Sequence, residues 1–140
     1  MGYELRQTPT GGVQLWEDLS GCQAAIVQSI SFTVNRGATN TQNIGQSLPS
    51  NARIVGIWVT VPVVSNAATT ANVSVGLVGG SNTFFSTAQD VKAAIGNFSQ
   101  AATANWVPSA SAQAISCTYT ETGTASTSGT AYVSVQFIAN

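Results

Sequence analysis

Apolar and polar residues alternate with a period of two along most of the chain. This period is typical of β-strands that have one face in a core and the other in water, and it differs from the 3.6-residue period of an amphipathic helix. It predicts short strands in the segments 25–35, 71–78, 114–121 and 130–139. The residues predicted to point inward are Ile26, Ile30, Phe32, Val34, Val73, Val75, Leu77, Ile115, Cys117, Tyr119, Val133, Val135 and Phe137.

The segment 53–64 (RIVGIWVTVPVV) is the most apolar of the chain, because it carries apolar residues on both faces of a predicted strand. Such a strand is typical of the middle of a sheet that is covered on both sides. On this ground Trp58 is predicted to be a core residue. Pro62 has no N–H to donate, so we expect it at the end of the strand or at a sheet edge. A hairpin is predicted to join this strand to the segment 71–78.

Three segments depart from the alternation. The segments 39–50 (TNTQNIGQSLPS) and 123–129 are rich in residues that favour turns, so turns are predicted there, the second one flexible. The segment 86–95 (STAQDVKAAI) could form one short helix, which Ser86 or Thr87 would cap and Gly96 would end. A further short strand is predicted around 105–107.

These elements predict an all-β fold: an antiparallel, jelly-roll-like β-sandwich with at most one short helix. A chain of 140 residues is long enough for one domain with a substantial core. We expect a single sandwich domain over residues 25–140, preceded by an N-terminal arm over residues 1–24. The arm differs in composition, since its apolar residues are spread among glycines, a proline and charged residues.

The chain is nearly free of charge. Charged residues make up 6% of it, against about 25% in an average soluble protein, and the net charge is −1. A protein with so few basic residues offers no electrostatic footprint for nucleic acid or anionic lipid. No apolar run approaches the roughly 20 residues that span a bilayer, and residues 1–9 lack the features of a signal peptide. We therefore expect no nucleic acid partner, no membrane partner and synthesis in a cytoplasm.

Catalytic chemistry has little support in the sequence. There is no histidine, so the commonest general base and metal ligand is missing. We predict that the protein is not an enzyme and holds no metal or cofactor, although a carboxylate pair or a calcium site built from distant segments stays open. The cysteines Cys22 and Cys117 are interpreted as buried, unpaired thiols. The acidic residues are scattered, at Glu4, Glu17, Asp18, Asp90 and Glu121.

A neutral surface suits permanent assembly, because burying it against a partner costs little desolvation of charge. Sheet edges are usually guarded by lysines, and Lys92 is the only lysine of this chain. A closed homo-oligomer, such as a trimer, would cover the edges. The alternative is that Ser and Thr side chains and a twisted edge are protection enough.

Two candidate contact regions follow from the apolar residues. The arm residues are predicted to pack across their own sandwich or against a neighbouring subunit, and Trp16 could instead anchor the chain on a larger scaffold, because aromatic anchors dominate many interfaces. Trp106, between Asn105 and Pro108, is the candidate for an exposed binding aromatic. The arm residues in question are Leu5, Val13, Leu15, Trp16 and Leu19.

The segments SLPSNARIVGIWVTV, over 47–61, and ANVSVGL, over 71–77, resemble small structural proteins of tailed bacteriophages. The resemblance is to capsid decoration, or cement, proteins with jelly-roll folds. It implies a homotrimer that binds the major capsid protein on the outside of the head, stabilises the shell against packaged DNA, and joins the virion after assembly in the host cytoplasm. Head-fibre and tail-fibre proteins have similar sandwiches, so a knob that binds host-surface glycans is the alternative.

Overall fold

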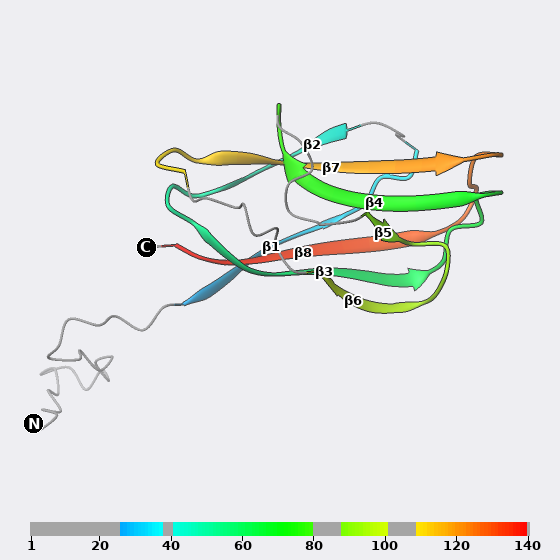
Figure 1. Cartoon of the computed structure of the whole chain (residues 1–140), viewed down its shortest axis with the longest axis horizontal. Helices are drawn as coiled ribbons and strands as arrows, with labels where there is room; N and C mark the ends of the chain where they lie inside the picture. The colour runs from blue at the N-terminus through cyan, green and yellow to red at the C-terminus, as the bar shows by residue number, and fades with distance from the viewer. Residues whose placement is uncertain (1–25, 38–40, 80–87, 101–108, 140) are drawn as a thin grey trace, which may run out of the picture.

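In a computed structural model, residues 26–37, 41–79, 88–100 and 109–139 are described, and all their regular elements are β-strands. The strands form two layers that lie face to face (Figure 1). The strands are β1 (Val27–Thr33), β2 (Thr41–Leu48), β3 (Arg53–Val63), β4 (Thr70–Leu77), β5 (Gln89–Asp90), β6 (Gly96–Gln100), β7 (Gln113–Thr122) and β8 (Thr130–Ile138).

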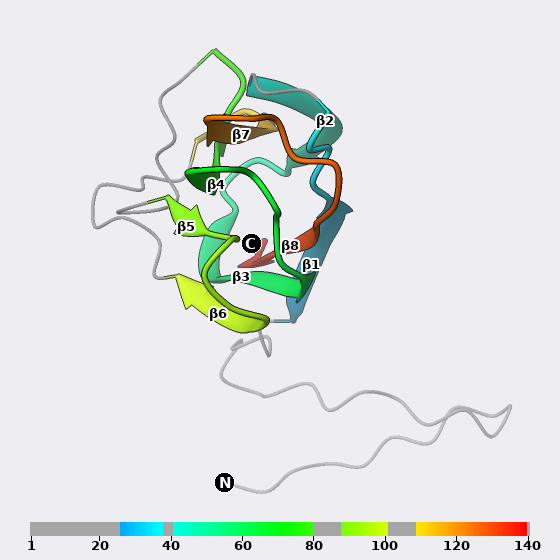
Figure 2. The ribbon, with the colours of Figure 1, turned by 90° about the vertical axis from the view of Figure 1, so that its right-hand side faces the viewer.

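Each layer is a four-stranded antiparallel sheet. One sheet has the order β1-β8-β3-β6 and the other has the order β2-β7-β4-β5. Consecutive strands therefore change sheets at every connection except β4 to β5, and Figure 2 shows the two sheets enclosing a common interior. This is the strand order of an eight-stranded jelly roll, so the predicted all-β sandwich is confirmed.

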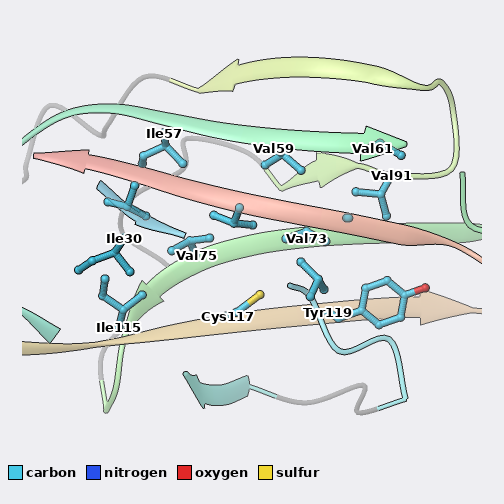
Figure 3. Packing of buried hydrophobic residues seen from close by; sticks show 14 of the residues in the cluster. Ile30, Ile57, Val59, Val61, Val73, Val75, Val91, Ile115, Cys117 and Tyr119 are labelled. Carbon is cyan, nitrogen blue, oxygen red and sulfur yellow. The ribbon is translucent and has the colours of Figure 1, made fainter. Parts of the chain in front are cut away.

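The core lies between the two sheets and is built almost wholly from small and medium aliphatic side chains (Figure 3). Ile57, Val59 and Val61 of β3 face Val73 and Val75 of β4 across it. The alternation in 114–121 and 130–139 correctly predicted which side chains of β7 and β8 point into the core. On β7 and β8 the buried residues are Ile115, Cys117, Tyr119, Ala131, Val133, Val135 and Phe137.

The strand β3 contains a bulge, and its outer face is exposed where the sequence predicts that both faces are covered. Its register against β8 shifts between Ile54 and Gly56, so that Val55 is an extra residue in the strand. A bulge of this kind changes which face the following residues occupy. Ile54 and Ile57 are both buried, whereas Trp58 is 40% exposed on the outer face of the sheet. The prediction that Trp58 is a core residue is wrong, because the face of β3 opposite Ile57, Val59 and Val61 is not covered at Trp58.

Other predictions about local structure are also wrong. The segment predicted as a turn contains β2, a mostly polar strand of which Leu48 is the buried residue. Residues 88–95 contain β5 and an irregular stretch in place of a helix. The strands β3 and β4 lie in different sheets, so they form no hairpin. Pro62 does lie at the end of β3, where the register shifts again, as expected.

Candidate interaction surfaces

The acidic residue Glu121 serves the structure at one end of the sandwich. Its carboxylate accepts hydrogen bonds from the Tyr119 hydroxyl at 2.8 Å and from the Ser126 backbone N–H at 3.2 Å. The Arg36 guanidinium donates to the Ser126 carbonyl oxygen at 2.9 Å. The hydrogen bonds from Ser126 and Tyr119, with a further contribution from the positive charge of Arg36, lower the pKa of Glu121. This carboxylate is therefore a fixed acceptor.

The same end of the sandwich holds the β7–β8 loop in place, although the sequence predicts a flexible turn there. The Asn66 carboxamide oxygen accepts the backbone N–H groups of Thr127 and Ser128, both at 2.9 Å. Two backbone hydrogen bonds join the same segments. The Ala68 N–H donates to the Thr124 carbonyl oxygen at 3.2 Å, and the Asn66 N–H donates to the Ser128 carbonyl oxygen at 3.3 Å. The loop is thus fixed to the β3–β4 connection, which lessens its value as an adaptable binding loop.

Two further side chains with chemical potential, those of Asp90 and Cys117, also have structural roles. Asp90 accepts the backbone N–H groups of Lys92 and Ala93, at 2.7 and 3.1 Å. Cys117 is unpaired and buried, and burial raises its pKa from 9.0 to about 12, so its thiol stays protonated at neutral pH. No cluster of three or more potential metal ligands occurs among the described residues, and none of their elements is a helix able to cross a membrane.

The outer face of the sheet β1-β8-β3-β6 presents neutral side chains in rows that run across the strands. One row joins Ser31 of β1, Ser134 of β8, Trp58 of β3 and Ser99 of β6. Ser134 lies 2.7 Å from the Ser29 hydroxyl and 3.2 Å from the Ser31 hydroxyl, measured between the oxygen atoms. Around Trp58 the face is therefore rich in hydroxyl groups and free of charge.

A hollow of about 280 Å³ opens on this face beside Trp58, and we call it the Trp58 hollow. The bulge at Val55 and the following Gly56 form one part of it, and Ser99 of β6 and Gln136 of β8 lie on either side of β3. Gln100 also lines the hollow, and its carboxamide is held by a 2.6 Å hydrogen bond to Gln89. The Trp58 hollow is lined by apolar and neutral polar residues only.

The four sheet edges differ in how they are protected from pairing with another chain. The strand β5 has two residues and charged neighbours, β6 has five residues, and β2 is interrupted by a register shift between Asn43 and Ser47. In contrast, β1 runs in unbroken register with β8 over Val27–Thr33 and contains no charged residue and no proline. Among the described strands none pairs with its outer side. By the usual rules β1 is an unguarded edge.

The predicted contact residues and the predicted exposed aromatic lie outside the described residues. This applies to Leu5, Val13, Leu15, Trp16 and Leu19 of the arm, and to Trp106. It also applies to Cys22 and to the strand expected around 105–107. Of the aromatic residues that the structure exposes, Trp58 was placed in the core by sequence reasoning. The signal that could have found it is the face that Trp58 shares with Thr60 and Pro62 in the alternation, opposite Ile57, Val59 and Val61.

The fold is similar to that of chains in two solved bacteriophage capsids. A chain in the "acidic stable capsid structure" of Helicobacter pylori bacteriophage KHP30 matches with a TM-score of 0.59 and 17% identity, over 84% of this chain and 89% of that chain. A chain in the capsid asymmetric unit of cyanophage Pam1 matches with a TM-score of 0.61 and 16% identity, over 96% of this chain and 98% of that one. At these identities the likeness is one of fold. No protein-family model matches the sequence, and a comparison with curated proteins finds no match.

Proposed function

We propose that this chain is a structural protein of a bacteriophage virion, a decoration protein that binds the outside of the head and stabilises the shell. The observation that carries the proposal is the fold shared with chains in two phage capsids, one of which is covered over 98% of its length. The same match covers 96% of this chain. The neutral composition supports the same role, because such a surface can be buried permanently at low cost. A role of this kind needs no catalytic group.

For the oligomer we propose a homotrimer in which the unguarded edge of β1 contacts a neighbouring copy. Edge pairing between identical chains continues indefinitely unless the arrangement closes, and a three-fold ring is one way to close it. The proposed arm over residues 1–24 precedes β1 directly in the sequence, so contacts by its apolar residues would extend the same interface. The major capsid protein is the second proposed partner.

The first test is the copy number of this protein in purified virus particles, measured by quantitative mass spectrometry against the major shell protein. Decoration predicts a stoichiometry comparable to that of the shell subunit. A handful of copies per particle would contradict decoration and would favour the alternative of a head-fibre or tail-fibre knob that binds host-surface glycans. Absence of the protein from the particle would overturn both.

The second test concerns the β1 edge and uses two matched valines. Val27, on β1, is 54% exposed, and Val78, after β4, is 46% exposed. A lysine on an edge strand opposes pairing, so Val27→Lys should reduce the mass of the assembly in light scattering towards that of a monomer. Val78→Lys adds the same charge at a comparable exposure and should leave the assembly unchanged. Equal effects of the two substitutions, or none from Val27→Lys, would rule out the β1 edge as the contact.

A further inference from the structure

Beside Gly56, in the Trp58 hollow, two polar side-chain atoms lie near one another. A methyl group built on Gly56 would lie 3.3 Å from Gln136 Oε1 and 3.5 Å from Trp58 Nε1. The first atom is a hydrogen-bond acceptor and the second is a donor. Within the described residues neither side chain has a hydrogen-bond partner. Beside Gly56 the hollow therefore presents a donor and an acceptor close together, both without a partner among the described residues.

The glycine at this point matters for space and not for backbone conformation. Gly56 is not among the glycines with positive φ, unlike Gly45 and Gly79. Any residue could adopt its extended conformation, so the missing side chain is what keeps the hollow open. The adjacent Val55 adds an apolar side chain, and Ser99, opposite Trp58 in the register of β6, adds a hydroxyl group.

We infer that the Trp58 hollow binds a neutral saccharide, with one sugar ring lying against the Trp58 indole and its hydroxyl groups paired with Gln136 and Ser99. A sugar ring has an apolar C–H face and a rim of hydroxyls that both donate and accept, which matches an indole beside a carboxamide and a hydroxyl. The volume of about 280 Å³ is close to the lower end for small-molecule sites, so it suits a ligand of one or two rings.

Charge and surroundings favour this ligand over the alternatives. No ionisable side chain lines the hollow, and on β3 the nearest charged residue is Arg53, three positions before Gly56. An anionic sugar would find no cation there. A protein anchor would need surrounding contacts that exclude water, whereas Trp58 lies between the hydroxyl-bearing residues Ser99 on β6 and Ser134 on β8.

The test is titration of the full-length protein with neutral sugars, followed by saturation-transfer NMR and tryptophan fluorescence. The probes are glucose, galactose, mannose and N-acetylglucosamine with their disaccharides, and N-acetylneuraminic acid is the anionic comparison. We expect at least one neutral sugar to bind with a Kd on the order of 1 mM, the usual range of weak single-site ligands. Added salt should leave this binding unchanged, because no charges are paired.

Two substitutions and one control make the test specific. Trp58→Ala removes the indole and Gly56→Ala fills the floor, and each should weaken binding about tenfold, the factor expected for one lost aromatic or hydrogen-bonding contact. Tyr132→Ala removes an aromatic residue that is 46% exposed on the same sheet but does not line the hollow, so it should leave binding unchanged. Circular dichroism and thermal unfolding check that each variant folds.

Several outcomes would overturn the inference. These are no binding by any neutral sugar, stronger and salt-sensitive binding of the anionic sugar, or binding that survives both Trp58→Ala and Gly56→Ala. A fourth is that the parent protein binds no sugar and that Trp58→Ala dissociates the oligomer or releases the protein from capsids. That result would make the hollow a contact with another protein chain. The copy number in the virion is measured on the parent protein and without added sugar, so the decoration proposal stands or falls separately.

Discussion

The Tyr119 hydroxyl donates a 2.8 Å hydrogen bond to Glu121 Oε2 and so joins a buried side chain of β7 to a carboxylate at the end of the same strand. Ser65 Oγ, in the β3–β4 connection, lies 3.2 Å from the same hydroxyl, and Ser126 of the β7–β8 loop donates its backbone N–H to the carboxylate. One tyrosine and one glutamate therefore connect the core to two loops.

This arrangement predicts a specific dependence of stability on acid. The pKa of Glu121 is lowered in the folded protein from its ordinary value of 4.5, so its carboxylate contributes stability above that pH and loses it as the pH falls through the folded pKa. Glu121→Gln should lower the unfolding temperature at pH 7, and its difference from the parent protein should shrink below pH 4. Thermal unfolding between pH 7 and pH 2 measures this.

A second variant controls for the glutamate itself. Tyr119→Phe keeps the buried ring but removes one of the hydrogen bonds that lower the pKa of Glu121. It should show the same acid-dependent loss over a narrower pH range than the parent protein. If Glu121→Gln and the parent protein keep a constant difference from pH 7 to pH 2, Glu121 does not act through its charge.

Two glycines with positive φ should differ in how well they tolerate a side chain. Gly129 has a φ of 129°, and a Cβ there would lie 2.8 Å from Ser65 Cα. Gly45 has a φ of 72° and nothing within 4 Å of a built Cβ. Gly129→Ala should cost about 3 kcal/mol or more, from strain plus displacement of the β3–β4 connection, whereas Gly45→Ala should cost about 1 kcal/mol from the backbone alone. Urea unfolding gives both values, and equal costs would contradict the close approach at Ser65.

The sequence predicted those strands in which successive side chains alternate between the two faces of the sheet without an inserted residue. The extra residues at the register shifts lie in β2 and β3, so β1, β4, β7 and β8 keep an uninterrupted period of two in their own residues. The strand β5 was missed because two residues carry no period, and β2 because its polar residues resemble a turn. On β3 the alternation placed Ile57, Val59 and Val61 on one face and Trp58 on the other, as the structure has them, but apolar residues on both faces do not show whether a second layer covers the outer face. The exposed aromatic was therefore placed in the core.

Ser116 offers a test of the cost of a buried polar group. Its hydroxyl is buried and has no hydrogen-bond partner among the residues that the structure describes, whereas the buried hydroxyl of Ser65 contacts the Tyr119 hydroxyl and the Ala67 N–H. Ser116→Ala should raise the free energy of unfolding by about 1 kcal/mol, and Ser65→Ala should lower it by a similar amount. For a chain of this size each change corresponds to about 3 °C in the unfolding temperature. A loss of stability in Ser116→Ala would indicate that the hydroxyl is hydrogen-bonded in solution.

The thiol of Cys117 should report on unfolding. It is buried in the core and its pKa is raised to about 12, so at pH 8 the native protein presents neither access nor thiolate to a reagent. In a Cys22→Ser background, which leaves one thiol, reaction with a disulfide reagent at pH 8 should be slower than that of the urea-unfolded chain by a factor of about a thousand or more, because it requires opening of the sandwich. Rapid labelling of native Cys117 at pH 8 would show that the core around β7 is open.

Because the native pKa of Cys117 lies above the value of 9.0 for the unfolded thiol, the stability of the protein should also fall as the pH rises from 9 towards 12. A Cys117→Ala variant in the same Cys22→Ser background controls for other ionisations at high pH, and it should lack the part of the loss of stability that comes from the Cys117 thiol.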